Sequence, residues 1–345
     1  MSSKRFRTMD ELALACGVSR PTLSKYFDDP ESVRAATRRK IEAALEGSEY
    51  RPNLFARNLN RKQTRHIGVI VPHITDPFYA ALVRKVELRC LDTGFWPIVI
   101  SSHGSPTLEA RAVDTLLSLK VAGALVAPLG AETDIKMLAS LQDDIPLVFF
   151  DSRIDGQGPF VGTDNRQSIA LLVEYLCRTG EHPTYFEMPP VNRNASERRE
   201  AYIAIMEQRG LEPIVVGQAQ DTSWEFEEIG FIEMQRILDA RSLPTRTILC
   251  ANDRIAFGVM SAAFSRGLKV GRDEDCDLRV AGHDDHPLSR YTCPPLTTVA
   301  QDIDAIAIRS TDILFASLRD GTDQSPGEPT VRTTLVGQLV MRQSA

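Results

Sequence analysis

Between residues 67 and 281, short apolar runs alternate with segments that have the spacing of amphipathic helices. Such runs are typical of strands buried on both faces, and parallel strands need a crossover connection, which is usually a helix. The alternation therefore predicts parallel sheets covered by helices, in two successive α/β lobes. The expected strands are 67–71, 98–100, 124–126, 147–150, 184–186, 214–216, 247–250 and 278–281, and the expected helices are 78–93, 107–119, 132–141, 166–178, 197–209, 225–239 and 254–266.

The first 50 residues have a different pattern, with two short helices around a glycine. Thr8 can cap the first helix while Glu11 reaches back to it, and the apolar stripe of that helix stops at Gly17. Ser19 can cap a second helix, in whose first turn Pro21 is tolerated. This arrangement predicts a helix-turn-helix, whose second helix can lie in the major groove of DNA.

Two more helical segments follow in this part of the chain. The apolar spacing predicts a third helix over 35–45, ended by Gly47. Another segment opens at Pro52 and has apolar residues as far as Leu59, which is too short for a stable isolated helix. We expect this segment to become ordered only when it meets a partner.

The charge is distributed unevenly along the chain. Up to Arg65 there are 14 Lys and Arg and 8 Asp and Glu, a net charge of +6, whereas the whole chain has −6 and the remainder therefore −12. A basic segment attached to an acidic body indicates attraction to a polyanion. The alternative is a basic face that is merely solvated, but the charges coincide with the helical pattern, which favours nucleic acid.

Composition bounds the class of protein. A chain of 345 residues, of which 43% are hydrophobic, can bury two or three cores. No apolar run approaches the roughly 20 residues of a membrane span, and no apolar stretch follows the basic N-terminal residues as in a secretory signal. The six cysteines are scattered without CxxC pairing, which favours free thiols over disulfides or zinc. We therefore expect a cytoplasmic protein without a membrane partner.

The sequence offers no positive sign of catalysis or of a cofactor. No glycine-rich phosphate loop opens either lobe, and no Ser-His-Asp grouping is identifiable by spacing, so we expect no enzyme. The run from His283 to His286 holds four potential metal ligands. Adjacent loop residues rarely converge tetrahedrally, so we also expect no metal.

Polar residues follow several of the predicted strands. Sites in open α/β sheets lie beyond the C-terminal ends of the strands, and with two lobes the natural site is the cleft between them. Side chains from both lobes can then face one another across that cleft. The polar runs are 73–76, 151–153, 192–199, 252–253 and 283–286.

Taken together, these motifs resemble the lac repressor family of bacterial transcription factors along nearly the whole chain. The DNA-binding part rests on Thr8 to Lys25, Thr37, Tyr50-Arg51-Pro52-Asn53, Ala56 and Leu59, and the ligand-binding part on Asp76-Pro77-Phe78-Tyr79, Asn252-Asp253-x-x-Ala256-x-Gly258, Gly282-His283-Asp284-Asp285 and Pro295-Leu296-Thr297-Thr298-Val299.

The resemblance implies an N-terminal all-α helix-turn-helix head with a hinge helix, then two α/β lobes with parallel sheets of the periplasmic-binding-protein-like type I. The implied domains are a DNA-binding head over 1–50, a hinge over 51–63, a first lobe over 64–162 plus 301–327, and a second lobe over 163–300 plus 328–345.

At the DNA, the resemblance places Arg20, Pro21 and Lys25 at base-reading positions and makes Leu59 a wedge in the minor groove. Lys25 can donate to guanine O6 and N7, whereas Pro21 offers only apolar contact. The alternatives are that Arg20 and Lys25 contact phosphates alone and that Leu59 packs on a partner hinge. Arg34 departs from the family's serine, so the third helix should lack a side-chain cap. The implied DNA-binding residues are Thr8, Ser19, Arg20, Pro21, Thr22, Ser24, Lys25, Thr37, Tyr50, Asn53, Ala56 and Leu59.

In the cleft, the resemblance implies a small polar effector, most often a sugar or sugar derivative. Carboxylates and guanidinium groups can bind hydroxyls, and an indole offers a flat apolar face. The alternatives are that Trp224 is simply core and that Arg199 and Asp284 form a structural ion pair. The implied effector contacts are Phe78, Tyr79, Asp151, Arg153, Arg193, Arg199, Trp224, Asn252, Asp253 and Asp284.

The sequence thus predicts a homodimeric transcriptional repressor that binds a near-palindromic double-stranded operator under the control of a small molecule. A solute-binding protein and a cytoplasmic enzyme with a DNA-binding appendage are the alternatives. The missing secretory signal and the basic head count against the first, and a turnover assay would test the second.

Overall fold

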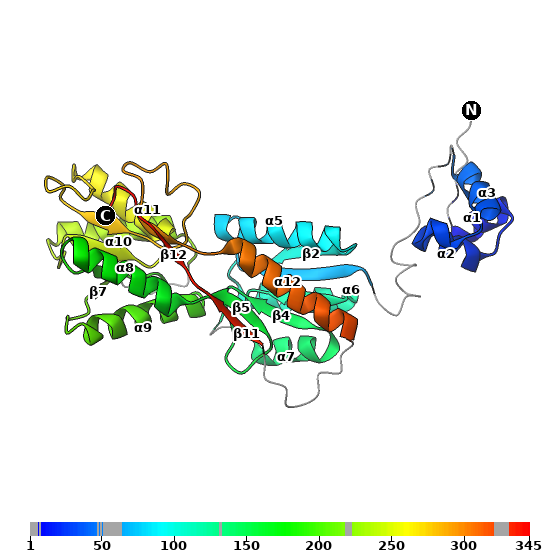
Figure 1. Cartoon of the computed structure of the whole chain (residues 1–345), viewed down its shortest axis with the longest axis horizontal. Helices are drawn as coiled ribbons and strands as arrows, with labels where there is room; N and C mark the ends of the chain where they lie inside the picture. The colour runs from blue at the N-terminus through cyan, green and yellow to red at the C-terminus, as the bar shows by residue number, and fades with distance from the viewer. Residues whose placement is uncertain are drawn as a thin grey trace. The chain divides into compact units, whose positions relative to one another are not determined.

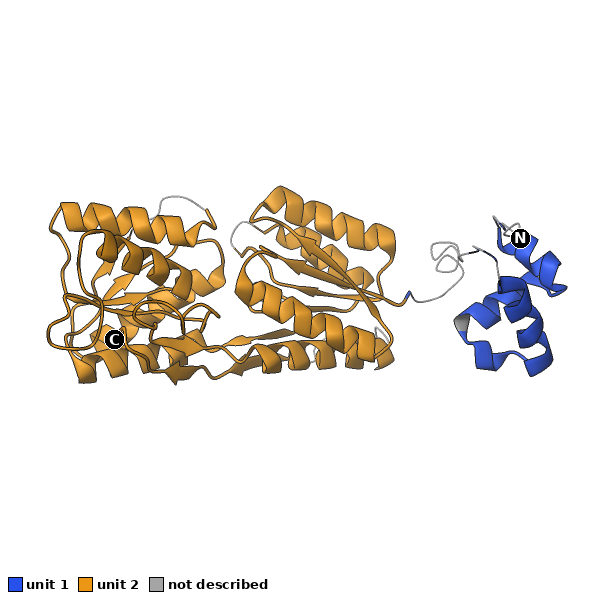
Figure 2. Cartoon of the chain, turned by 90° about the horizontal axis from the view of Figure 1, so that it is seen from above, with its two compact units in different colours: residues 1–64 blue, residues 65–345 orange. Residues whose placement is uncertain are grey.

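The computed structural model describes residues 6, 8–46, 48, 50, 64–130, 133–217, 223–320 and 331–345. The chain forms two compact units, Met1–Thr64 and Arg65–Ala345 (Figure 2).

The first unit is a small helical head. It contains α1 (Met9–Cys16), α2 (Arg20–Asp28), a 3-10 turn (Pro30–Ser32) and α3 (Ala35–Leu45), around a core in which Leu12, Leu23 and Ile41 are fully buried. Thr8 caps α1 and Ser19 caps α2, as the sequence predicts, each by accepting a hydrogen bond from a backbone N–H of the first turn. Gly17 has a φ of 62° at the end of α1, a left-handed conformation that glycine adopts without strain.

The first lobe of the second unit contains a six-stranded sheet in the order β11-β5-β4-β3-β1-β2, with every neighbouring pair parallel (Figure 1). Helices α5 and α12 pack on one face through one apolar cluster, and α6 and α7 pack on the other face through a second. The strands are β1 (His66–Val71), β2 (Trp96–Ser101), β3 (Gly123–Val126), β4 (Leu147–Phe150), β5 (Phe160–Thr163) and β11 (Arg332–Leu335), and the helices are α5 (Pro77–Asp92), α6 (Pro106–Leu119), α7 (Ile135–Asp144) and α12 (Ile303–Asp320).

The second lobe contains a four-stranded parallel sheet in the order β7-β6-β8-β9 and a short antiparallel pair, β10 with β12. Helices α8 and α9 pack together, as do α10 and α11. The strands are β6 (Thr184–Phe186), β7 (Val215–Val216), β8 (Thr247–Cys250), β9 (Arg279–Ala281), β10 (Thr298–Ala300) and β12 (Gln338–Val340), and the helices are α8 (Asn165–Thr179), α9 (Arg193–Gln208), α10 (Phe226–Asp239) and α11 (Asp253–Ser265).

The structure confirms the predicted head and the two parallel α/β lobes, and it corrects several details. Strand β11 pairs with β5 in the first sheet, so the assignment of all of 328–345 to the second lobe is wrong for this strand. The chain crosses between lobes at β5 to α8, at β10 to α12 and at β11 to β12 (Figure 1). Helix α9 begins at Arg193, before the predicted start at residue 197. No described helix is both long and apolar enough to cross a membrane.

Candidate functional site

A small cavity of about 40 Å³ lies between the two lobes of the second unit. Both lobes supply its walls, and most of the lining side chains are polar or aromatic. The lining residues are Asp76, Phe78, Tyr79, Asp151, Met188, Asn192, Asn194, Arg198, Trp224, Phe226, Asn252, Asp284 and Gln301.

Helix N-termini bring several of these side chains to the cavity. Asp76 caps α5 by accepting a hydrogen bond from the N–H of Phe78 at 2.9 Å. Asn192 caps α9 and Asn252 caps α11 in the same way. A capping residue ends a loop and starts a helix, so it lies at the mouth of its βα unit, where α/β proteins bind ligands.

The centre of the cavity is an ion pair between Arg198 and Asp284, with an Nη2 to Oδ1 distance of 3.1 Å. The same Oδ1 also accepts hydrogen bonds from Gln301 Nε2 and from His283 Nδ1, both at 2.8 Å. Burial by itself raises the pKa of Asp284, but Arg198 and the two hydrogen bonds outweigh it and keep that pKa below its usual value. Burial lowers the pKa of His283 to about 4, so its imidazole is neutral at pH 7. Asp284 is therefore a carboxylate at physiological pH.

A second buried carboxyl group, Asp151, forms another part of the wall. It accepts hydrogen bonds from the Tyr79 hydroxyl at 2.6 Å and from Asn194 Nδ2 at 3.1 Å. Its φ of 61° lies in the left-handed region, which is uncommon for a residue other than glycine and is often found at functional sites. Burial raises the pKa of Asp151 to about 7.

An aromatic wall completes the cavity. The ring of Trp224 lies 5.1 Å from that of His73, 6.3 Å from that of Tyr79 and 5.5 Å from that of Phe226, measured between centroids. A Cβ added at Gly104 would lie 2.6 Å from the indole, so this glycine leaves room for Trp224. Because His73 and Tyr79 belong to the first lobe and Trp224 to the second, the indole packs across the cleft.

Polar contacts also join the two lobes around the cavity. Arg254 Nη1 lies 3.1 Å from Asp76 Oδ2, and the guanidinium also binds Glu227. On the other side, Arg153 Nη2 lies 2.8 Å from Glu197 Oε1. Ligand pockets are typically roughly 300 Å³ or larger, so the lobes must part before this cavity admits a metabolite.

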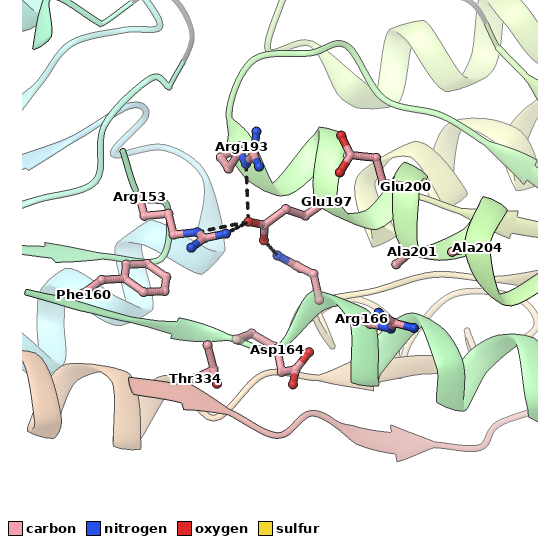
Figure 3. Close-up of a pocket in the computed structure, with 12 residues that line it drawn as sticks. Arg153, Phe160, Asp164, Arg166, Arg193, Glu197, Glu200, Ala201, Ala204 and Thr334 are labelled. Carbon is pink, nitrogen blue, oxygen red and sulfur yellow. Dashed lines mark hydrogen bonds and ion pairs between the residues drawn. The ribbon is translucent and has the colours of Figure 1, made fainter. Parts of the chain in front are cut away.

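A second, larger cavity of about 410 Å³ lies beside the Arg153–Glu197 contact (Figure 3). Its charged side chains are of both signs, and Arg153 and Arg193 both point to one oxygen of Glu197. The lining residues are Arg153, Phe160, Thr163, Asp164, Asn165, Arg166, Arg193, Glu197, Glu200, Ala201, Ala204 and Thr334.

The structure brings together six of the predicted effector contacts and leaves four outside the interlobe cavity. Phe78, Tyr79, Asp151, Trp224, Asn252 and Asp284 line it, whereas Arg153 and Arg193 line the second cavity.

Arg199 does not line the interlobe cavity, whereas the neighbouring Arg198 does. The Arg199 side chain is 48% exposed and pairs with Glu187, whereas that of Arg198 is 5% exposed and faces the cavity. Once α9 starts at Arg193, residue 198 falls on its buried face with Ala195. The apolar spacing of Ala201, Tyr202 and Ile205, which lies within the predicted helix, could have shown this, because residue 198 is on the same face.

Asp253 does not line the cavity either, because it is buried behind it. Its carboxylate accepts hydrogen bonds from Ser289 Oγ at 2.5 Å, from Thr298 Oγ1 at 2.6 Å and from the N–H of His286 at 2.8 Å. It therefore ties the start of α11 to the 286–298 segment. Burial raises the pKa of Asp253 to about 8.

The raised pKa values of Asp253 and Asp151 predict that the second unit loses stability between pH 7 and pH 8. In this range the folded state holds protons that unfolded aspartates have lost, so stability falls as the pH rises, by at most about 1.4 kcal/mol per pH unit for each group. Histidines of this unit whose pKa values are lowered by burial, His283 among them, oppose this trend below pH 7, where they bind more protons in the unfolded state. Asp253→Asn should reduce this slope in urea unfolding followed by tryptophan fluorescence, to which Trp96 and Trp224 contribute. An unchanged slope would contradict the assignment to Asp253.

On the head, the predicted DNA-binding side chains lie on and around α2. Arg20, Pro21 and Lys25 are exposed, and Arg20 Nη1 lies 3.4 Å from Asp10 Oδ2. Arg34 makes no side-chain cap hydrogen bond on α3, as its identity predicts. Thr8 and Ser19 are exposed, and Thr22, Ser24 and Thr37 are partly buried.

Tyr50 packs against the head core, with its ring 6.0 Å from that of Phe27. Asn53, Ala56 and Leu59, together with the hinge at 51–63, lie outside the described residues. Among the described residues there is no cluster of His, Cys, Asp and Glu that could hold a metal ion.

The chain matches known proteins along both units. Residues 8–53 match the family model for bacterial regulatory proteins of the lacI family, and residues 168–345, more than half of the chain, match that for the periplasmic binding protein-like domain. The ribose operon repressor of Escherichia coli (strain K12) is 28% identical over 319 residues, which cover 92% of this chain and 94% of that protein. The transcriptional repressor PurR of Actinobacillus pleuropneumoniae serotype 3 (strain JL03) is 27% identical over 323 residues, with 92% and 94% covered.

Solved structures show the same likeness. A crystal structure of the lac repressor dimer bound to operator and the anti-inducer ONPF has a TM-score of 0.82 and 28% identity, and covers 99% of each chain. Both the sequence matches and the fold include the head and the two-lobed unit. This chain therefore combines a head of the lacI family of bacterial regulatory proteins with a periplasmic binding protein-like domain.

Proposed function

We propose that this protein is a sequence-specific transcriptional repressor whose affinity for operator DNA is set by a small polar effector bound between the lobes. The observation that carries the proposal is that one chain combines a capped helix-turn-helix, with Arg20 and Lys25 exposed on α2, and a polar cavity between two lobes. The named relatives are repressors, and one solved relative is bound to operator.

The polar atoms around the cavity favour an uncharged, hydroxyl-rich effector such as a sugar. Oδ1 of Asp284 accepts three hydrogen bonds, whereas Oδ2 accepts none from the described residues. Asn192 uses its oxygen as a helix cap, which leaves its NH₂ group as a donor. A free carboxylate oxygen, an amide donor and the Trp224 ring can bind a polyol. The name of the ribose operon repressor and the lac repressor complexes with ONPF and ONPG support this class.

The proposed mechanism is a shift in lobe closure. An effector that binds one lobe arrangement better than the other shifts the population toward it, and a difference of about 1–3 kcal/mol is enough for regulation. We propose that the protein acts as a cytoplasmic homodimer, since one solved relative is a lac repressor dimer. Two heads then bind two half-sites of a near-palindromic operator. We propose no catalytic activity, because the named relatives are regulators.

The test is selection of DNA by the purified full-length protein from genomic fragments, in competition with bulk DNA at moderate ionic strength and with a metabolite library present or absent. We expect one or a few near-palindromic fragments, bound by two chains each, and release or capture by one polar metabolite. No preference for any fragment under any of these conditions would overturn the proposal.

Lys25→Ala is expected to lower affinity for the selected operator by about ten- to a hundredfold and to relax its specificity, because a base contact by lysine carries about 1–3 kcal/mol of discrimination. Lys40→Ala, at an exposed position of α3, should change affinity for operator and competitor DNA by similar factors. Fluorescence anisotropy on both DNAs measures the ratio. Equal losses for Lys25→Ala would mean that Lys25 contacts phosphates only.

A further inference from the structure

The carboxylate of Glu197, on α9, is bound from both lobes. Its Oε1 accepts hydrogen bonds from Arg153 Nε at 3.1 Å and from Arg153 Nη2 at 2.8 Å, and Arg153 lies in the first lobe. Arg193 Nε approaches the same oxygen at 3.5 Å (Figure 3). The Arg153–Glu197 contact therefore joins the two lobes.

The other oxygen of Glu197 orients a buried amide. Asn165 Nδ2 donates to Glu197 Oε2 at 2.8 Å and to Asn194 Oδ1 at 3.0 Å. With both acceptors on the NH₂ side, the carbonyl oxygen of Asn165 must face the opposite way. There it accepts a hydrogen bond from Arg198 Nε at 3.0 Å.

Arg198 is thereby held in one orientation. Its Nε binds Asn165, its Nη1 donates to the carbonyl oxygen of Ala251 at 2.9 Å, and its Nη2 donates to Asp284 at 3.1 Å. A planar guanidinium fixed at three nitrogens presents its remaining N–H groups in a defined direction. It is also the one basic side chain among the described residues that line the interlobe cavity.

We propose that Glu197 is a positioning residue that couples closure of the lobes to the orientation of Arg198. Its contact with Arg153 links it to the first lobe. Its hydrogen bond with Asn165 fixes the orientation of the Arg198 guanidinium, which faces the cavity. The consequence for effector binding rests on the proposed function. The coupling itself does not, because every contact in it is between residues of this chain.

Only a carboxylate at position 197 can accept hydrogen bonds from both Arg153 and Asn165. Arg153 offers donors and so does Asn165, whereas a glutamine would present one oxygen and one NH₂ group. In Glu197→Gln either Arg153 loses its acceptor or the amide of Asn165 must turn and place its NH₂ group against Arg198. Each outcome uncouples the two lobes.

The test follows hydrogen exchange at Nε–H of Arg198 by NMR in the full-length protein without effector, with the signal identified by its loss in Arg198→Lys. Glu197→Ala should accelerate this exchange by about tenfold, the effect of losing one hydrogen bond around a charged group. Arg153→Gln should also accelerate the exchange, although Arg153 itself does not contact Arg198. Arg153→Gln should add nothing in the Glu197→Ala background. Glu200→Ala is the matched control, because Glu200 lies one turn further on α9 and points away from Glu197 (Figure 3).

Three results would overturn the proposal: unchanged exchange in Glu197→Ala, an effect of Arg153→Gln that persists without Glu197, or an unprotected Arg198 signal in the parent protein. If Glu197→Ala fails to fold, as judged by circular dichroism, Glu197→Gln replaces it with the same expected acceleration. Because the measurement uses no effector, a negative result leaves the proposed function standing, and failure to find an effector leaves the coupling result standing.

Discussion

Arg198→Ala is expected to lower effector affinity at least about a hundredfold while operator affinity without effector stays within a factor of about two. The guanidinium supplies charge-assisted donors in the cavity and neutralises Asp284, whose burial without a partner costs about 3–5 kcal/mol. The cavity of the variant therefore holds an unpaired carboxyl group. The measurements are calorimetric titration with the effector found by screening, and fluorescence anisotropy with the selected operator.

Arg199→Ala is the matched control, since it removes the same side chain one position along α9. Arg199 is 48% exposed and pairs with Glu187 outside the cavity, and exposed pairs contribute at most about 1 kcal/mol. Effector affinity should therefore be unchanged. If Arg199→Ala lost the effector and Arg198→Ala retained it, the assignment made from the sequence would be right and the one made from the structure wrong.

The pattern of apolar runs was enough to predict the two lobes, because strands buried on both faces need continuous apolar residues. Every predicted strand is present, and no strand end differs from its prediction by more than two residues. Strand β5 (Phe160–Thr163) contains Gly162 and Thr163, and β11 (Arg332–Leu335) has three polar residues and alternating exposure. Neither strand was predicted from the sequence, because neither has the continuous apolar run on which the prediction depends.

The candidate site was predictable where a side chain follows a strand or caps a helix, as with Asp151, Asn252 and Asp284. It was not predictable where position depends on a contact between distant residues. Arg254 and Asp76 are 178 residues apart, and nothing near either one indicates that they join the lobes. Asp253 was predicted to contact the effector because it follows Asn252 in a motif. The sequence did not show that hydroxyl groups from the 286–298 segment bind its carboxyl group.

Gly258→Ala is expected to destabilise the second lobe by about 3 kcal/mol or more. Helices α10 and α11 cross with their backbones in contact, and a Cβ at Gly258 would lie 2.1 Å from the carbonyl oxygen of Glu227 and 2.5 Å from the N atom of Phe231. A Cβ at Gly230 would similarly lie 2.4 Å from the carbonyl oxygen of Ile255. Backbone atoms cannot turn away as a side chain can, so the helices must move apart, which costs more than ordinary overpacking.

The same change should weaken effector binding, because the two helices begin at the interlobe cavity. Phe226 opens α10 and Asn252 caps α11, and both line that cavity, so separating the helices displaces part of its wall. Urea unfolding followed by tryptophan fluorescence measures the stability. Ser261→Ala, at an exposed position of α11, is the control that should change it little. An unchanged urea midpoint for Gly258→Ala would mean that α10 and α11 can accommodate a Cβ at this position without moving apart. The geometry of the cavity would then not depend on this contact.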